Sequence, residues 1–410
     1  MSTRSLQQTL DSIGLPWMTV LLIALASSLI YLGPSLWQTW TDDGPTLVTS
    51  GGFVTGHDFV AFYAASKAVL AGNAAMVYDR DFMMAVQIEI VAASDIGYLA
   101  FMYPPTYLLL VAPLAALPYL AALALWQVLP FVFFLLLLRR IALSPIALVM
   151  AAGAPAVAQT LFAGQNGLVF ALFLGGGLMV LDRRPLLAGL LFGLAAAKPQ
   201  LVALLVPALI AGREWKSLAA MLAAGTGIAA LSAVLFGPDI WSSYVSVPAD
   251  ARDFLALGQL PWSRMPTLYT AARLAGLSDF AGTVLQIAGT SLIFAGVAWI
   301  WWRGAALELR IASVLAGAPL ATPFLYDYDL PFMVVAVGLY LAYALKRGPA
   351  LWEKIMLLLV WLQPVWWWWQ LVEATRVSPS PLVYAAFFAA ILSRARTSLP
   401  CTESVSHSQT

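Results

Sequence analysis

The residues best suited to chemistry are polar and charged side chains that border apolar segments of the chain. Asp58 follows the first apolar segment and precedes a run in which Phe59, Phe62, Ala65 and Val69 recur at helical spacing. A carboxylate at this place is an N-cap or first-turn residue, where the helix dipole favours its charge. Asp58 therefore either only caps the helix or also serves as a general base.

Lys198 is the second candidate, because it lies between two short apolar runs and is followed by Pro199 and Gln200. A lysine at membrane depth is costly and usually pairs with an anion or lines a pathway. The side chain either extends outward to water or binds a phosphate or carboxylate. The polar corner that it forms with Gln200 favours binding.

Polar side chains also mark other junctions. Tyr103 stands before a Pro-Pro pair at the expected start of a helix, and Gln165 and Asn166 form a polar break that is either a turn or a ligand contact. The segment 322–329 carries paired acids that bind sugar hydroxyls or a metal, or only solvate a loop; its polar members are Tyr326, Asp327, Tyr328 and Asp329.

Two further candidates adjoin these segments. His57 directly precedes Asp58. Arg264 lies in a long loop with Arg252 and Trp262, and we expect these three residues to form part of a lid.

Composition limits what these residues can belong to. The 410 residues are 61% hydrophobic and 10% charged, with a mean hydropathy of +0.85, which is typical of a polytopic α-helical membrane protein. The net charge of +1 gives no basic field for nucleic acid. The single Cys401 excludes a disulfide framework or thiolate metal site, and two histidines, His57 and His407, exclude a histidine zinc site within one chain.

Twelve apolar runs predict about twelve transmembrane helices: 16–37, 104–138, 141–159, 166–181, 185–197, 201–210, 217–236, 280–302, 305–321, 330–345, 351–369 and 381–392. Run 104–138 holds either two spans or a re-entrant piece and one tilted span, because Pro113, Pro118 and Pro130 are expected to break it. Runs 185–197 and 201–210 are too short to cross ~30 Å of hydrocarbon alone.

Basic residues set the orientation, since they accumulate on cytoplasmic loops. With one crossing in 104–138, 14 of the 21 lysines and arginines are cytoplasmic, and both termini are inside. The long loops 39–103, 237–279, 322–329 and 370–380 then face outward, so we expect function on the extracytoplasmic side. Residues 1–396 form one integral membrane domain with an amphipathic interfacial helix pair in loop 39–103, and 397–410 is a disordered polar cytoplasmic tail.

The order and spacing of several motifs carry a resemblance to a known family. The motifs are Asp58 after the first span, Val77-Tyr78-Asp79, Phe101-Met102-Tyr103-Pro104-Pro105, Gly164-Gln165-Asn166, Arg183-Arg184-Pro185, Ala197-Lys198-Pro199, Thr322-Pro323 and Tyr326-Asp327-Tyr328-Asp329. Across 58–330 the chain resembles glycosyltransferase family 87, whose members are similar to polyprenyl-phosphate-mannose-dependent mannosyltransferases of the C-type membrane glycosyltransferase (GT-C) fold. Relatives often carry a histidine where this chain reads 322–329, which has none.

The resemblance implies an inverting transfer of a hexose, mannose favoured, from a polyprenyl phosphate to a hydroxyl of a lipid or envelope glycan, with Asp58 as general base and no cofactor. A bacterial inner or plasma membrane is the expected location. Lys198, helped by Gln165 and Arg264, is expected to stabilise the leaving phosphate. The remaining candidates are expected to bind substrate: His57, Tyr103, Asn166, Gln200, Tyr326, Asp327, Tyr328 and Asp329.

Two other functions remain open. A transporter or lipid flippase would use Lys198, Asp327 and Asp329 as a polar path through the membrane. A non-catalytic subunit of envelope assembly would share the family pattern without activity.

Overall fold

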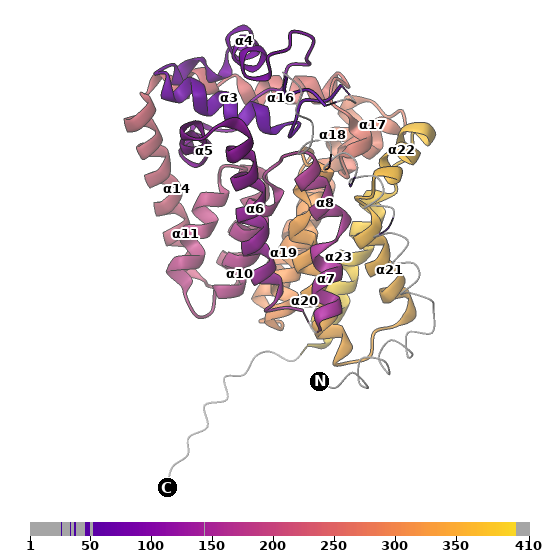
Figure 1. Cartoon of the computed structure of the whole chain (residues 1–410). Coiled ribbons are helices and arrows are strands. Elements are labelled where there is room, and N and C mark those ends of the chain that lie inside the picture. The colour runs from indigo at the N-terminus through magenta and orange to yellow at the C-terminus, as the bar shows by residue number, and fades with distance from the viewer. Residues whose placement is uncertain are drawn as a thin grey trace.

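The computed structural model describes residues 26, 33, 37, 46–49, 52–142 and 144–398, and these residues form helices joined by turns and loops, with no strand among them (Figure 1). The predicted first span, 16–37, lies almost entirely outside the described residues, as does the tail beyond residue 398. The all-helical class expected from the sequence is confirmed.

Among the described residues, three helices are long and apolar enough to cross a membrane: α6 (Tyr119–Leu138), α14 (Trp215–Phe236) and α18 (Asp279–Trp302). A fourth candidate is the pair α7 (Pro145–Ala152) and α8 (Pro155–Phe162), which is bent by 41°. The twelve-span count and the GT-C fold stay predictions beyond these helices.

Other helices pack beside the long ones. The predicted short runs are confirmed as α11, α12 and α13, because the helix ends before Lys198 and restarts at Pro199. The helices of this group are α9 (Gly167–Ala171), the π-turn η3 (Leu172–Gly176), α10 (Gly177–Val180), α11 (Pro185–Ala195), α12 (Pro199–Val202), α13 (Leu205–Ala211), α19 (Leu307–Ala321), α20 (Pro331–Leu345), α21 (Leu351–Leu362), α22 (Trp366–Thr375) and α23 (Ser380–Thr397).

Run 104–138 divides into a short piece and one long helix. The short piece is α5 (Pro105–Val111) with the 3₁₀ turn η2 (Ala112–Ala116), and the long helix is α6. Pro113 and Pro118 stand at the breaks, but the prediction for Pro130 was wrong, because Pro130 lies inside α6. A proline inside a helix removes one backbone hydrogen bond, and an apolar membrane helix can tolerate this loss. One crossing preceded by a short helical piece is the arrangement found.

An outer cap covers the upper end of the helices in Figure 1. It contains α3 (Phe59–Leu70), η1 (Ala74–Tyr78), α4 (Arg80–Val91), α15 (Asp239–Tyr244), α16 (Val247–Ala256), η4 (Trp262–Arg264) and α17 (Leu268–Leu274). The predicted helix after Asp58 is confirmed, and Gly72 follows its C-cap. The exposed polar face expected of an amphipathic helix is not found: nine of its twelve residues are buried, because α4, α5, η1 and η2 pack around it. Its place at a membrane interface stays a prediction.

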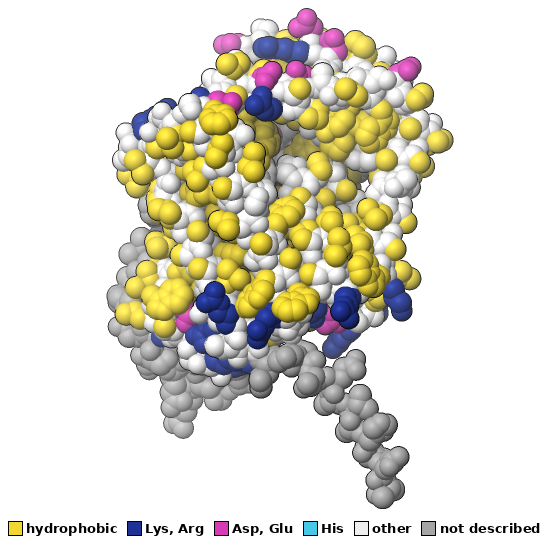
Figure 2. Space-filling model, turned by 180° about the vertical axis from the view of Figure 1, so that it is seen from behind, with side chains coloured by type: hydrophobic (Ala, Val, Ile, Leu, Met, Phe, Trp, Pro, Cys, Tyr) yellow, Lys and Arg dark blue, Asp and Glu magenta, His cyan; other side chains and the backbone are white. Residues whose placement is uncertain are grey.

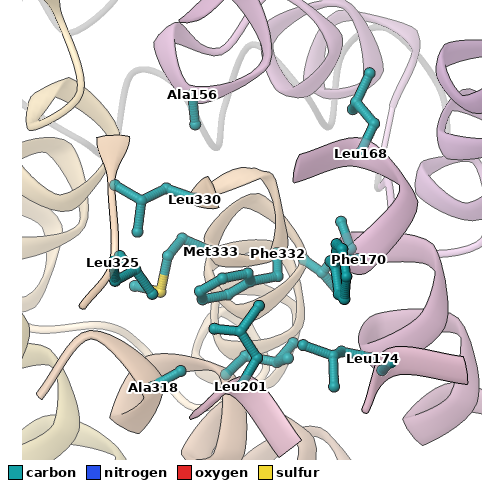
Figure 3. Packing of buried hydrophobic residues seen from close by; sticks show 14 of the residues in the cluster. Ala156, Leu168, Phe170, Leu174, Leu201, Ala318, Leu325, Leu330, Phe332 and Met333 are labelled. Carbon is teal, nitrogen blue, oxygen red and sulfur yellow. The ribbon is translucent and has the colours of Figure 1, made fainter. Parts of the chain in front are cut away.

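The apolar core lies beneath this cap. In Figure 3, Phe332 and Met333 of α20 lie among Leu201 of α12 and Phe170 and Leu174 of the α9–η3 segment. This packing fixes the two breaks in the helices, before α12 and before α20, relative to each other. Residues predicted to belong to the functional site lie at both breaks.

Charged residues separate along the long axis of the molecule. Figure 2 shows lysines and arginines gathered at the lower end and most acidic side chains at the upper end, with hydrophobic side chains over the surface between them. The lower end includes the loop between α10 and α11, with Arg183 and Arg184. The outer cap, which carries a few basic residues such as Arg80 and Arg252, therefore lies at the end opposite the larger group of lysines and arginines.

Candidate active site

A cavity of about 830 Å³ lies beneath the outer cap. The start of α3, the segment 98–104, one face of α16 and the breaks before α12 and α20 form its walls. Eight of the twelve predicted site residues line it: Asp58, Tyr103, Gln165, Lys198, Gln200, Tyr326, Tyr328 and Asp329. These residues are far apart in sequence and meet in one cavity.

Asp58 is the residue at the N-cap of α3, but its side chain makes no capping hydrogen bond. Its Oδ2 accepts a hydrogen bond of 2.9 Å from Gln165 Nε2 instead. Burial raises the pKa of Asp58, while the Gln165 hydrogen bond and the nearby Arg264 act in the opposite direction. The reading of Asp58 as only a helix cap is therefore wrong, and its carboxylate faces the cavity.

Backbone contact brings Gln165 beside Asp58. The Asp58 N–H donates to the Ala163 carbonyl at 3.1 Å. Gly164 has φ +61°, and a Cβ there would overlap the Gly56 carbonyl oxygen. Only glycine allows this close approach. The polar break is thus a turn and also presents a side chain to the site.

Lys198 contributes an ammonium that is buried at the cavity wall. Its Nζ is paired with Asp329 Oδ1, and both side chains are less than a tenth exposed, at 6% and 7%. The ammonium also lies 5.4 Å, 5.0 Å and 6.0 Å from the ring centres of Tyr103, Phe170 and Tyr328. Lys198 therefore pairs with a carboxylate of this chain, and its predicted binding of a donor phosphate stays a prediction.

Arg264 and Asp327 form a second pair. Arg264 Nε and Nη2 donate to the two Asp327 oxygens at 3.0 Å and 2.8 Å, a bidentate geometry. Neither residue lines the cavity. The pair lies behind Tyr328, whose ring centre is 5.5 Å from the Arg264 guanidinium carbon.

The segment between α19 and α20 is fixed by backbone contacts. Asp329 Oδ2 accepts from the Tyr326 N–H at 3.1 Å. The Thr160 hydroxyl donates to the Tyr328 carbonyl at 2.6 Å. Tyr326 and Tyr328 stack with ring centres 4.9 Å apart. The carboxylates of this segment are therefore held by the fold and do not merely solvate a loop.

Two other predicted residues lie outside the cavity. The His57 ring lies 5.2 Å from that of Phe53 and 4.3 Å from that of Phe162. Burial, with a smaller effect of Arg264, lowers the pKa of His57 to about 4, so the ring is neutral at pH 7. Asn166 is fully buried and donates from Nδ2 to the Tyr107 hydroxyl at 2.8 Å.

The sequence interpretation missed part of the cavity wall. Arg80, Tyr98 and Tyr244 line it, as do apolar residues on one face of α16. The α16 face could have been predicted, because Val247, Ala251 and Leu255 are four residues apart and so lie on one face of a helix. Arg252, predicted as part of a lid, is on the same helix and lines the cavity too.

The chemistry available is that of the Asp58 carboxylate, which has no cationic hydrogen-bond partner, together with amides, an ammonium, two guanidinium groups and several tyrosines. Among the described residues, no group of three or more histidine, cysteine, aspartate or glutamate side chains is placed to hold a metal ion. Of the carboxylates that line the cavity, Asp329 is paired with Lys198, whereas the Asp58 carboxylate accepts only from a neutral amide. Proton transfer at Asp58 is the reaction that this arrangement supports directly.

Comparison with known proteins gives one match. The sequence model of glycosyltransferase family 87 matches residues 101–323. No curated protein and no solved structure matches the chain. The matched region contains Tyr103, Gln165, Lys198 and Arg264 and begins after Asp58. Because the match covers more than half of the 410 residues, and its helices build the cavity that Asp58 enters, this chain belongs to glycosyltransferase family 87.

Proposed function

We propose that this integral membrane glycosyltransferase moves a hexose, mannose favoured, from a polyprenyl phosphate to a hydroxyl of a lipid-linked or envelope glycan. The observation that carries the proposal is the Asp58 carboxylate, which lines the cavity and accepts its hydrogen bond from neutral Gln165 rather than from a cation. A carboxylate neutralised by an ion pair is a weaker base, and Asp58 is not neutralised in this way.

In the proposed reaction, Asp58 accepts the proton of the acceptor hydroxyl as its oxygen bonds to the anomeric carbon. The bond from that carbon to the phosphate oxygen breaks, and the phosphate leaves with the electron pair. Attack and departure on opposite faces invert the anomeric configuration. A phosphate leaving group needs no proton, so no second acid is required, unlike in glycoside hydrolysis.

Lys198 is proposed to receive the phosphate. An ammonium has three N–H donors, and Asp329 occupies one of them, which leaves two for phosphate oxygens. Gln200 lines the same part of the wall. Arg264 is held by Asp327 outside the cavity, and the bidentate pair is proposed to support Tyr328 and to act on the phosphate only through its charge.

The cavity wall suits a lipid donor. Phe62, Leu99, Met102, Phe254 and Leu260 are among the apolar residues that line it. A hydrophobic surface lies directly below the cap in Figure 2, and a recess opens there between hydrophobic side chains. A prenyl chain can therefore stay in an apolar environment while its phosphate reaches Lys198.

The proposed active site is extracytoplasmic, in a bacterial inner or plasma membrane with both chain termini in the cytoplasm. The support is the gathering of lysines and arginines at the end of the molecule opposite the cap. A transporter with a polar path is less well supported, since Asp327 is paired with Arg264 outside the cavity and so does not extend a path from Lys198 and Asp329.

The test supplies purified protein in lipid vesicles with radiolabelled polyprenyl-phosphate hexoses and a bacterial membrane-lipid extract. We expect label to pass to a lipid or glycan product, with polyprenyl-phosphate mannose the best donor and the anomeric configuration inverted. A parallel reaction with a nucleotide-linked hexose should give no product. Transfer from the nucleotide sugar alone, or uptake of labelled solute without transfer, would contradict the proposal.

A further inference from the structure

The Asp58 carboxylate is the end of a chain of two side-chain hydrogen bonds. Gln165 Nε2 donates to Asp58 Oδ2 at 2.9 Å, and the Tyr103 hydroxyl donates to Gln165 Oε1 at 3.2 Å. All three residues line the same cavity. We infer that Gln165 and Tyr103 are positioning residues that hold the Asp58 carboxylate ionised and aimed at the acceptor. This inference deepens the proposed function and rests on it.

The Tyr103 hydroxyl determines which end of the Gln165 amide faces Asp58. Burial raises the pKa of Tyr103 well above its ordinary value, so the hydroxyl keeps its proton and acts as a donor. Its proton goes to the amide oxygen, and the amide NH₂ is left to face Asp58. An N–H donated to a carboxylate favours the charged form, which is the form a base needs.

Rigid contacts hold Tyr103 in this position. Its ring stacks on that of Tyr107 with centres 4.4 Å apart, and its carbonyl accepts from the Tyr78 hydroxyl at 2.8 Å. The Tyr107 hydroxyl accepts in turn from Asn166. Two adjacent amides thus bond to two tyrosines four residues apart. Only the Tyr103–Gln165 pair lines the cavity, so the Tyr107–Asn166 pair is a matched control.

Other groups also act on Asp58, and they stay unchanged in the variants below. Arg264 favours its charged form and Asp327 opposes it. The remaining ionisable side chains around it are His57, Tyr326, Tyr328 and the Lys198–Asp329 pair across the cavity. A shift on changing Gln165 or Tyr103 therefore reports these two residues.

The test measures the ionisation of Asp58 without any substrate. Thermal unfolding of the wild-type protein and of Asp58→Asn is followed from about pH 4 to about pH 9, and the two Tm values are subtracted. Because the pKa of Asp58 is raised on folding, the wild type is relatively most stable at low pH and loses this advantage as the pH rises through the folded-state pKa. The midpoint of that loss lies halfway between the unfolded-state and folded-state pKa values of Asp58, so it moves when the folded-state pKa moves.

The same subtraction is made for each variant, with and without Asp58→Asn. Gln165→Met should move the midpoint upward by about half a pH unit, and Tyr103→Phe should move it in the same direction by less. Tyr107→Phe should lower Tm, because Asn166 loses its hydrogen-bond acceptor, yet it should leave the midpoint in place, because the Tyr103–Gln165 hydrogen bond is unchanged. Identical midpoints in wild type, Gln165→Met and Tyr103→Phe would overturn the inference.

An activity measurement separates this inference from the proposed function. With radiolabelled polyprenyl-phosphate mannose as donor, the acid limb of the rate should move with the midpoint, and kcat at neutral pH should fall about tenfold or more while KM changes little. A midpoint that moves while the acid limb stays fixed would show that the pair does not position a base. Midpoints that move in proteins that transfer no sugar would refute the proposed function alone.

Discussion

Replacing Lys198 alone should destabilise the protein more than replacing Lys198 and Asp329 together. The two side chains are 6% and 7% exposed, so either one left without its partner is a buried, uncompensated charge. Such a change costs about 3–5 kcal/mol, whereas replacing both members of a buried pair is often nearly neutral. In the double variant Lys198→Met/Asp329→Asn, the amide oxygen of the introduced side chain can still accept from the Tyr326 N–H.

The assay is thermal unfolding of Lys198→Met, Asp329→Asn and the double variant in the same detergent. For a chain of this length, each single change should lower Tm by roughly 3 to 6 °C, and the double change by less than either. The coupling between the two sites should be about 2 kcal/mol or more. Losses that simply add would refute the view that the pair is one buried electrostatic unit.

The double variant also separates the two roles of Lys198. If its ammonium binds the donor phosphate, the double variant should regain stability but keep a donor KM raised about tenfold or more, since a charge-assisted hydrogen bond is lost. The acceptor KM should change little. Recovery of full transfer together with stability would show that Lys198 is structural only.

Three further predictions follow from the same geometry. The transfer rate should fall as the pH drops through the raised pKa of Asp58, so the acid limb in a pH–rate profile should lie above the value of about 3.9 of a free aspartate; a limb below that value would contradict the burial of the base. Gly164→Ala should lower the free energy of unfolding by about 2–4 kcal/mol, because its Cβ would meet the Gly56 carbonyl and its φ is +61°. The control Gly225→Ala, in open space on α14, should change it by no more than about 1 kcal/mol. Equal losses in the two variants would contradict this prediction. His57→Asn, which tolerates the φ of 48°, should leave the acid limb in place, because the pKa of His57 is about 4 and the ring is already neutral; a shifted limb would assign the proton transfer to His57.

Residue type and spacing were enough to predict much of the site. An aspartate before a helix, a lysine between two short apolar runs and a polar break at Gln165 are unusual in a chain this apolar, and all three line the cavity. The short helices around Lys198 were predictable because their length falls below that of a span. The family resemblance was predictable from motif order and is confirmed over residues 101–323.

The partners of these side chains were not predictable. Lys198 and Asp329 are 131 residues apart, and Arg264 and Asp327 are 63 apart, so only tertiary packing brings them together. Sequence spacing assigned Gln165 to a phosphate, but its amide faces Asp58 because Gly164 allows the turn to touch the start of α3. Spacing also indicated a half-exposed α3, since it could not show that α4 and α5 cover the second face.

The most direct test of the central claim is a single-turnover measurement on Asp58→Asn with polyprenyl-phosphate mannose bound. The variant keeps the size of the side chain and an acceptor oxygen for Gln165, but it removes the base. We expect donor binding close to that of the wild type and a transfer rate lower by about two to four orders of magnitude. A transfer rate within a few-fold of wild type in a folded variant with bound donor would contradict the claim that Asp58 accepts the proton.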